Sequence, residues 1–332
     1  MDSPIARYLE KQPFIVLDGA LATELERRGA DLNDPLWSAK CLVEQPEMIR
    51  AVHLDYFKAG ADLATAATYQ ATFEAFRRRG ILRDGAAQLM RDAVALAAAA
   101  RDEYWAGLKN RAGRLRPLIA ASVGSYGAML ADGSEYRGLY AVSDQSLTAF
   151  HRPRLEVLAQ SGADLLACET IPCLREARVL AHLLREFPAV TAWISFSCRD
   201  GAQTCAGDEI SGCAAALQDH PQIAAVGVNC TRPEYVRDLL LRMRDRTDKP
   251  LLAYPNSGES YDPATKRWTG APCEKSFAQQ AAAWYQAGAR LIGGCCRTTP
   301  DDIRAISALR AQCSEKCGSR FSKNARTPST QS

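Results

Sequence analysis

The segment AGADLATAAT (residues 59–68) decides the fold, because it joins a glycine that can end a helix to a continuous run of small and apolar residues. The same arrangement returns as SGADLLACET (residues 161–170) and AGARLIGGCC (residues 287–296). Glycine suits the left-handed conformation that closes a helix. A run that stays apolar, without alternation, is typical of a parallel strand covered on both faces. Each copy therefore predicts a helix-to-strand junction of an α/β fold.

Similar apolar runs occur along the whole chain, and segments with helical spacing separate them. Eight such strands and eight helices, joined by right-handed crossovers, close most simply into a (β/α)8 barrel. The predicted strands are residues 14–19, 62–68, 118–124, 163–170, 191–197, 224–230, 250–256 and 290–295. The predicted helices are residues 46–58, 84–105, 143–160, 174–187, 209–219, 233–245, 273–286 and 300–309.

A doubly wound open sheet is the alternative architecture for this pattern. Two features argue against it: no Gly-x-Gly-x-x-Gly motif follows any predicted strand, and the last strand is as apolar as the middle ones. We therefore predict a single-domain α/β protein, a (β/α)8 TIM barrel over residues 1–311. The tail, residues 312–332, lacks apolar periodicity and is expected to be disordered.

The connections are unequal in length, and this indicates where a site lies. Those that lead from strand to helix at residues 19–45, 124–142 and 256–272 are long and rich in Gly, Ser, Asp and aromatic residues, whereas most helix-to-strand connections are short. Long ordered loops are usually functional. In a barrel they gather on the C-terminal face, where active sites lie.

The composition limits the classes of function. Hydrophobic residues make up 47% of the 332 residues and charged residues 24%, which is ordinary for a globular protein. Basic and acidic residues are interspersed, with a net charge of +3, so no nucleic-acid partner is indicated. The longest purely apolar stretch, residues 93–100, is too short to span a bilayer, and the N-terminus lacks the apolar core of a signal peptide. We expect a cytoplasmic protein that acts on small molecules, with no membrane partner.

Three of the twelve cysteines fall where strands end. Cys230 ends the sixth predicted strand, and Cys295 and Cys296 end the eighth, after Gly293 and Gly294. Neighbouring residues of a regular strand face opposite ways, so both vicinal cysteines reach one ion only if the backbone turns, and the glycines permit that turn. Three thiolates with an open fourth position match a zinc site of catalytic type. This soft ligand set also suits a substrate sulfur.

Other interpretations of the thiols stay open. Free cysteine is among the most buried residue types, so all three could be ordinary core residues. A disulfide between the vicinal pair is a further option, although its ring is strained. The remaining cysteines show no comparable convergence and are predicted to be structural or incidental: Cys41, Cys168, Cys173, Cys198, Cys205, Cys213, Cys273, Cys313 and Cys317.

Six segments, in this order, resemble those of the homocysteine S-methyltransferases. The likeness covers about residues 10–310 and is greatest to the branch that uses S-methylmethionine, whose relatives include betaine–homocysteine methyltransferase and the homocysteine module of cobalamin-dependent methionine synthase. The segments are residues 17–25 (LDGALATEL), 67–72 (ATYQAT), 167–170 (ACET), 227–230 (GVNC), 254–259 (YPNSGE) and 293–298 (GGCCRT).

The resemblance implies one zinc ion per chain, held by the three strand-end cysteines, and no further catalytic residue. It implies that homocysteine binds at Asp18, Gly19, Thr68 and Glu169, and that Asn256 contributes to the substrate site. The chemistry agrees, because Glu169 suits the ammonium group and backbone N–H groups near Gly19 and Thr68 suit the carboxylate. The structural alternatives are an ion pair at the barrel mouth for Glu169 and a turn for Asp18.

The implied reaction is methyl transfer from a sulfonium donor to the homocysteine thiol, giving methionine. Zinc would keep the thiol ionised at neutral pH, and the leaving group is a neutral thioether that needs no proton. S-methylmethionine is the donor that the branch favours, S-adenosylmethionine the alternative, and betaine the weaker option. Aromatic faces attract a sulfonium, and the candidates are Trp37, Tyr69, Tyr126, Tyr254 and Trp268. The competing function is a non-catalytic zinc- or thiol-binding barrel that acts as a metal or redox sensor.

Overall fold

Eight parallel strands form the centre of the protein, for which a computed structural model describes residues 3–32, 34, 36–262 and 267–324. Their order is β1-β10-β7-β6-β5-β4-β3-β2, and a parallel bridge between Leu17 and Leu63 joins the edges at β1 and β2. The sheet therefore closes, and the predicted (β/α)8 barrel is confirmed. The strands are β1 (Ile15–Val16), β2 (Leu63–Ala66), β3 (Leu118–Gly124), β4 (Leu165–Ile171), β5 (Ala192–Phe196), β6 (Ile223–Asn229), β7 (Leu251–Tyr254) and β10 (Ala289–Ile292).

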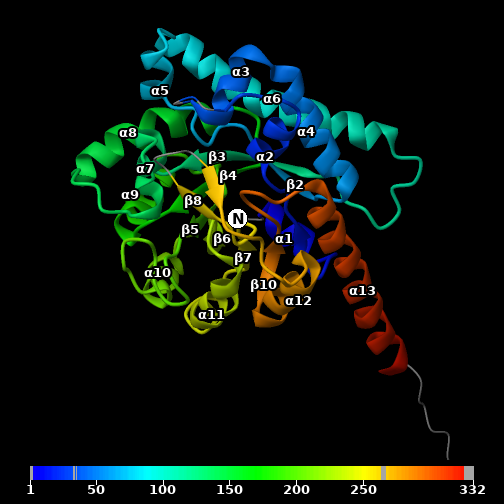
Figure 1. Ribbon diagram of the computed structural model, residues 1–332. Helices are drawn as coiled ribbons and strands as arrows, with labels where there is room; N and C mark the ends of the chain where they lie inside the picture. Colours follow the sequence, from blue (N-terminus) through cyan, green and yellow to red (C-terminus); the bar gives the residue numbers. More distant parts are fainter. Residues whose placement is uncertain (1–2, 33, 35, 263–266, 325–332) are drawn as a thin grey trace, which may run out of the picture.

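Helices surround the strands in the way that the spacing predicts (Figure 1). Their apolar faces pack onto the outer side of the barrel and form the larger of two core clusters. None of the helices in the described ranges combines the length and the hydropathy needed to cross a lipid bilayer. The eight predicted helices are α4 (Pro46–Ala59), α6 (Arg83–Gly107), α8 (Asp144–Leu158), α9 (Leu174–Leu184), α10 (Ile210–Leu217), α11 (Pro233–Arg244), α12 (Phe277–Ala287) and α13 (Pro300–Asn324).

The recurring glycine junctions end helices as predicted. Gly60 caps α4 with a φ of 111°, Gly288 caps α12 with a φ of 117°, and Gly162 follows α8 with a φ of 84°. At Gly60 a Cβ atom would also lie 2.3 Å from the Ser307 hydroxyl oxygen of α13. This position therefore requires glycine for its conformation and for the close approach of two helices.

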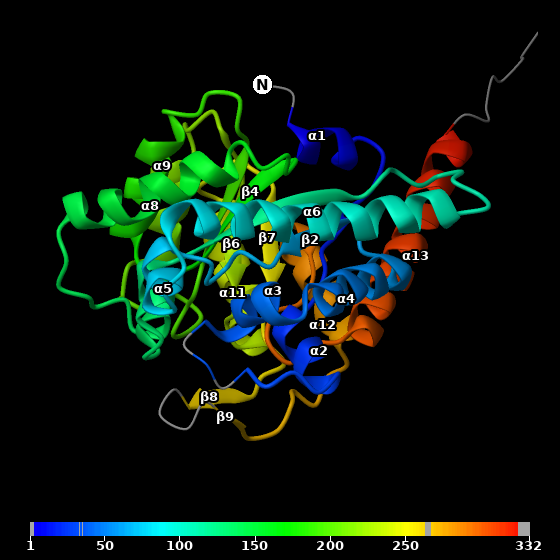
Figure 2. The same ribbon diagram turned by 90° about the horizontal axis from the view of Figure 1, so that it is seen from above.

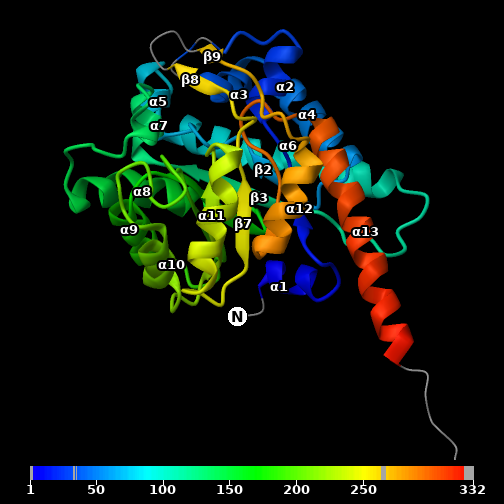
Figure 3. The ribbon, with the colours of Figure 1, turned by 60° about the horizontal axis from the view of Figure 1, so that its bottom comes forward.

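The barrel interior is filled at its N-terminal end. Trp193 of β5 is fully buried there among alanines of the neighbouring strands, so one large side chain is matched by small ones. Helix α1 (Pro4–Leu9) adds Ile5 and Tyr8 to the same cluster. Figure 3 shows α1 at this end and β8 and β9 at the opposite end. The barrel interior is thus filled at this end, and a separate hollow lies between α1 and the segments that lead into β5, β6 and β7.

Additional short elements occupy the strand-to-helix connections, as the unequal loops predicted. Figures 2 and 3 show the antiparallel pair β8 and β9 beyond the barrel end, near α2. The sequence pattern did not predict these elements individually. They are α2 (Leu21–Arg27), η1 (Trp37–Ala39), α3 (Lys40–Glu44), α5 (Phe73–Arg78), α7 (Tyr126–Leu130), η2 (Ser134–Tyr136), β8 (Ser260–Asp262) and β9 (Arg267–Thr269).

The C-terminal segment departs from the prediction. Helix α13 continues to Asn324, past the predicted helix end at residue 309 and into the segment 312–332 that was expected to be disordered. The helix extends away from the barrel in Figures 1 and 3. A polar segment that continues an existing helix needs no apolar face to become helical. The costly nucleation step has already been made by the preceding turns. Residues 325–332 lie outside the described residues.

His53 is a buried residue of α4 that should make the protein sensitive to acid. Neither ring nitrogen has a hydrogen-bond partner among the described residues, and burial lowers the pKa of the imidazole to about 4. The unfolded chain has the ordinary pKa of about 6.5, so it binds more protons between these values. The stability conferred by neutral His53 is therefore present above pH 6.5 and is lost as the pH falls toward 4.

We expect His53→Leu to abolish this part of the acid sensitivity. Between pH 7.5 and pH 5, the wild-type protein should lose about 2 kcal/mol of unfolding free energy through His53, and the variant should not. Urea unfolding of both proteins at the two pH values measures the difference. An equal loss of stability in both proteins would contradict the assignment.

Candidate active site

Three sulfur atoms meet at the C-terminal end of the barrel. The Cys230 Sγ lies 2.9 Å from the Cys295 Sγ and 3.5 Å from the Cys296 Sγ, and the last two are 4.0 Å apart. Tetrahedral zinc with bonds of about 2.3 Å places its sulfur ligands about 3.8 Å apart; the two distances to Cys296 are close to this value, and the distance between Cys230 and Cys295 is shorter. Within the described ranges it is the one group of three or more Cys, His, Asp or Glu ligand atoms that lie within 4.8 Å of one another.

The vicinal cysteines reach the same point because they follow β10 in irregular backbone. Gly293 and Gly294 serve close packing, which differs from the expected turn: added Cβ atoms would lie 2.5 Å from the Leu17 Cβ and 2.3 Å from the Thr298 hydroxyl oxygen. Positive φ angles belong instead to Cys230 (47°) and, beyond the pair, Arg297 (68°). A separation of 4.0 Å is about twice an S–S bond, so the vicinal pair is not a disulfide.

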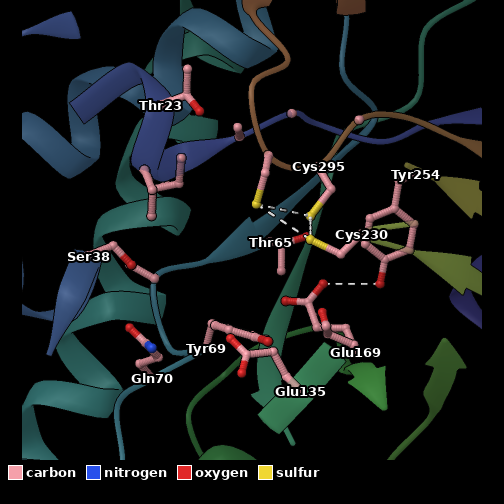
Figure 4. A pocket seen from close by; sticks show the side chains of 18 of the residues that line it. Thr23, Ser38, Thr65, Tyr69, Gln70, Glu135, Glu169, Cys230, Tyr254 and Cys295 are labelled. Carbon is pink, nitrogen blue, oxygen red and sulfur yellow. Dashed lines mark hydrogen bonds between the residues drawn. The ribbon is translucent and has the colours of Figure 1, made fainter. Parts of the chain in front are cut away.

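The sulfur cluster forms one wall of a pocket (Figure 4). Of the residues expected at the site, Asp18, Gly19, Glu169 and the three cysteines line this pocket, whereas Thr68 and Asn256 do not. The lining consists of Asp18, Gly19, Ala20, Leu21, Ala22, Thr23, Glu26, Asp34, Ser38, Thr65, Ala66, Ala67, Tyr69, Gln70, Ala131, Gly133, Glu135, Tyr136, Glu169, Thr170, Cys230, Tyr254, Trp268, Gly294, Cys295 and Cys296.

Glu169 lies at the bottom of this pocket on β4 and is held by two hydroxyl groups. The Ser122 hydroxyl donates to Oε1, and the Tyr254 hydroxyl donates to Oε2 at 3.0 Å. The Trp193 indole N–H in turn donates to the Tyr254 oxygen at 3.0 Å. Burial raises the pKa of Glu169 to about 7. Within the described ranges Glu169 forms no ion pair, and its carboxylate oxygens accept from hydroxyl groups instead.

An irregularity at the end of β4 lets two consecutive residues face the pocket. The register with β5 shifts between Cys168 and Ile171, and Thr170 has a φ of 56°. Asn229 of β6 holds this backbone: its Oδ1 accepts from the Thr170 N–H at 2.7 Å, and its Nδ2 donates to the Thr170 hydroxyl at 2.8 Å. Glu169 and Thr170 thus both line the pocket, as residues beside a bulge can.

Asp18 faces the pocket and also joins the ends of two strands. Its carboxylate accepts from the Thr65 N–H at 2.8 Å and from the Thr65 hydroxyl at 3.3 Å, and burial raises its pKa to about 8. Gly19, next to it, has no room for a side chain, since a Cβ atom would lie 2.9 Å from both the Thr298 hydroxyl and the Tyr56 ring. The structural interpretation of Asp18 therefore holds alongside a position at the pocket.

Thr68 and Asn256 act on the walls rather than the pocket itself. The Thr68 hydroxyl is fully buried and donates to the Ser122 carbonyl oxygen at 2.7 Å, which ties β2 to β3 behind the lining. The Asn256 Oδ1 accepts from the Gly258 N–H at 3.0 Å and shapes its own turn. Each side chain thus has a hydrogen bond to a backbone group, and contact of either residue with a substrate stays a prediction.

The aromatic candidates divide in the same way. Tyr69, Tyr254 and Trp268 line the pocket. Tyr126 packs instead against aromatic rings of α8 and its preceding connection, with centroid distances of 5.2 and 5.3 Å. The Trp37 side chain lies outside the described residues. Of the three that line the pocket, Tyr254 also supports Glu169 through its hydroxyl group.

Several residues of the site come from loops and gave no strand-end signal. Tyr136 on η2 places its hydroxyl 3.5 Å from the Cys230 sulfur, and Glu135 beside it is buried, which raises its pKa to about 7. Gln70 reaches the pocket from the connection after β2. An acidic residue inside the long connection at residues 124–142 was the one available signal for Glu135.

A buried arginine holds the loop that carries Tyr69 and Gln70. Arg154 of α8 donates to the carbonyl oxygens of Thr68 and Tyr69 at 2.6 Å and of Gly124 at 3.0 Å. The residue is 1% exposed, and burial lowers the pKa of its guanidinium to about 10. The ends of β2 and β3 are thus fixed from outside the barrel.

The charge of the pocket is one-sided. Its lining contains five carboxylic acids in addition to the three thiols, and none of the described lining residues is lysine, arginine or histidine. Asp34 has Arg79 as an ion-pair partner and Glu26 is exposed, whereas the other three acids are buried and form no ion pair among the described residues. A buried acid without a cationic partner favours a ligand that supplies the positive charge. The acids are Asp18, Glu26, Asp34, Glu135 and Glu169.

The sequence is similar to those of known methyltransferases. The sequence profile of the family described as Homocysteine S-methyltransferase matches residues 15–309. Homocysteine S-methyltransferase YbgG of Bacillus subtilis is 55% identical over 306 residues, which are 92% of this chain and 97% of the relative. Homocysteine S-methyltransferase of Escherichia coli is 49% identical over 92% of this chain and 98% of its own length. Selenocysteine Se-methyltransferase of Brassica oleracea is 49% identical over 88% of each chain.

Solved structures agree with the sequences. The metallated form of the homocysteine methyltransferase MmuM from Escherichia coli superposes with a TM-score of 0.83 at 46% identity, covering 92% of this chain and 99% of that one. Its oxidized form gives the same TM-score at 47% identity and the same coverage. A methyltransferase from Methanosarcina mazei, 12% identical with a TM-score of 0.54, shares the fold alone.

Proposed function

The chain belongs to the homocysteine S-methyltransferase family, and from this premise we propose that it transfers a methyl group from a sulfonium donor to the thiol of L-homocysteine with one bound zinc ion. S-methylmethionine is the favoured donor and S-adenosylmethionine the alternative. The observation that carries the proposal is the convergence of three cysteine sulfurs and a buried carboxylate in one pocket.

Cys230, Cys295 and Cys296 would hold the zinc ion. The spacing of their sulfurs suits it, and the similar MmuM protein has been crystallised in a metallated form. When bound, zinc supplies an open position for the acceptor sulfur and favours its ionised form at neutral pH. The Tyr136 hydroxyl, 3.5 Å from the Cys230 sulfur, can donate to that thiolate and moderate its charge.

The acceptor would be held by groups at the bottom of the pocket. Glu169 is oriented by two hydroxyl donors and retains carboxylate lone pairs for the ammonium group of homocysteine. Its carboxylate would lie against the backbone at Gly19, which lines the pocket. Asp18 keeps the ends of β1 and β2 together under this contact.

The methyl donor would enter a pocket with excess negative charge. Tyr69 and Trp268 offer aromatic faces to a sulfonium, and the acidic lining attracts a cation. In the transfer, the acceptor sulfur forms a new bond to the methyl carbon while the donor's S–C bond breaks, and the electron pair of that bond stays on the departing thioether. No proton moves to the leaving group, so the work of the pocket is alignment.

The decisive experiment is methionine formation by the zinc-loaded protein with S-methylmethionine, S-adenosylmethionine and betaine supplied separately. We expect turnover with a sulfonium donor, loss of at least about 100-fold of the rate on chelation, and recovery on addition of zinc. If betaine were the only compound that supported turnover, the proposal of a sulfonium donor would be refuted. Unchanged activity in fully metal-depleted protein would refute the role of the metal.

The acceptor range and the location follow from the same chemistry. Because a relative bears the name selenocysteine Se-methyltransferase, a selenol such as selenohomocysteine is the second acceptor to supply in this assay. Free thiols in the cluster require a reducing compartment, so we propose that the protein acts in the cytoplasm. The sensor alternative is not retained, because a site that only binds metal has no need of the acidic pocket beside the sulfurs.

A further inference from the structure

Two buried acceptor atoms in the pocket have no partner. They are the Glu135 Oε2 and the Gln70 Oε1, each in a residue that is 8% exposed. Among the buried side-chain atoms that lack a hydrogen bond in the described part of the chain, these two belong to residues of the pocket lining. Buried acceptors are almost always satisfied in folded proteins, so a pair of them facing one pocket indicates a ligand that brings donors.

Both acceptors are fixed by the same short helix. The Gln70 amide N–H donates to the Ala128 carbonyl oxygen of α7 at 3.3 Å, which leaves its oxygen as the free end. The backbone of Glu135 packs against Gly127 of α7, where a Cβ atom would lie 2.5 Å from the Glu135 nitrogen. The Ser197 hydroxyl also donates to the Glu135 carbonyl oxygen at 2.8 Å. The two side chains are thus held in place before a ligand arrives.

The position of these residues separates them from the group proposed for homocysteine. Figure 4 draws Gln70, Tyr69 and Glu135 along one edge of the pocket, across from the sulfur atoms, with Glu169 nearer to Tyr254. Glu169 has two hydroxyl donors, whereas Glu135 has a free oxygen. No described lining residue is cationic, and nearby Arg137 forms its ion pair with Asp132, so a cationic substrate group is a suitable partner for Glu135.

We propose that Glu135 and Gln70 form the binding site for the α-ammonium group of the methyl donor, and so make the enzyme selective for sulfonium donors that are α-amino acids. This inference rests on the proposed function, in which both substrates are α-amino acids and two ammonium groups need partners. An ammonium group has three donors, so it can satisfy the Glu135 and Gln70 oxygens together. A donor without that group would leave both buried acceptors unpaired and would be selected against.

The test compares S-methylmethionine with 4-(dimethylsulfonio)butanoate, which is the same molecule without its amino group. In Glu135→Gln, kcat/KM for S-methylmethionine should fall about 10- to 100-fold, the loss of a hydrogen bond between charged groups. The kcat/KM for the deamino compound should change less than about 3-fold; if this compound turns over too slowly, its inhibition constant is measured instead. The KM for homocysteine should also change less than about 3-fold. Gln70→Met should lower kcat/KM for S-methylmethionine about 3- to 10-fold.

The control variant is Asp31→Asn, which removes one acidic charge in the connection between α2 and η1, outside the pocket lining. In this variant, kcat/KM for each of the two donors should stay within about 2-fold of the wild-type value. Equal losses for both donors in Glu135→Gln, or no loss for S-methylmethionine, would overturn the inference. A wild-type enzyme that turns over no sulfonium donor would instead refute the proposed function, so the two failures are distinguishable.

Discussion

Replacing Cys295 with serine is expected to remove both the bound metal and the activity. The Cys295 sulfur lies 2.9 Å from the Cys230 sulfur and 4.0 Å from the Cys296 sulfur, so it completes the only three-ligand cluster in the described ranges. A serine hydroxyl is a poor zinc ligand in a site built from thiolates. The variant therefore keeps only two sulfur ligands, one fewer than a catalytic zinc site requires. We expect less than about 0.1 zinc per chain and a kcat/KM lower by about 1000-fold or more.

Metal analysis after gel filtration and the methionine assay measure these two effects. The matched control is Cys273→Ser, because Cys273 is half-buried like Cys295, lies in the strand-to-helix connection after β7 and stands outside the cluster. The Cys273 backbone N–H donates a hydrogen bond to the Ser257 carbonyl oxygen at 2.9 Å. Replacing the side chain with that of serine leaves this bond in place. A Cys295→Ser protein that keeps one zinc and full activity would refute the assignment of the cluster.

The fold could be predicted from the sequence because its signals are local. The glycine in AGADLATAAT ends a helix within one turn of the strand that follows, and Gly60 and Gly288 both adopt the left-handed conformation this requires. The continuous apolar strands required cover on both faces, which a parallel barrel supplies. The polar end of α13 was missed, since residues 312–324 extend a helix without the apolar face that a pattern search requires.

The site was predictable where it lies at strand ends. Cys230 directly follows β6, Glu169 lies near the end of β4, and Cys295 comes three residues after the end of β10, so the barrel geometry brings them to one face. The direction of a side chain is a different matter. Thr68 also follows a strand, yet its hydroxyl turns to the Ser122 carbonyl oxygen behind the pocket wall.

Residues that reach the site across long sequence separations could not be predicted. Arg154 contacts carbonyl oxygens 85 and 86 residues away, at Tyr69 and Thr68, and nothing in its own helix marks it as a support of the pocket. Glu135 and Gln70 gain meaning only because α7 brings their two loops together. Such contacts depend on tertiary packing, which overrides any local pattern.

Glu169→Gln is expected to raise the KM for homocysteine by about 100-fold, because it removes the charge proposed to bind the ammonium group in a buried position. The glutamine keeps the shape of the side chain, and its oxygen can still accept from the Tyr254 hydroxyl, which now donates to Glu169 at 3.0 Å. The KM for the donor should change less than about 3-fold, and zinc content should stay at one per chain. Steady-state kinetics in both substrates and metal analysis measure these quantities.

Ser122→Ala separates the charge of Glu169 from its orientation. This variant leaves the carboxylate and the Tyr254 bond intact and removes only the hydroxyl that donates to Oε1. Its KM for homocysteine should rise about 10-fold or less, the effect of one hydrogen bond to a charged group. A Glu169→Gln enzyme that lost kcat while its KM for homocysteine stayed unchanged would mean that the carboxylate acts in the transfer step. Glu169 binds the acceptor only if the loss appears in KM and follows the charge.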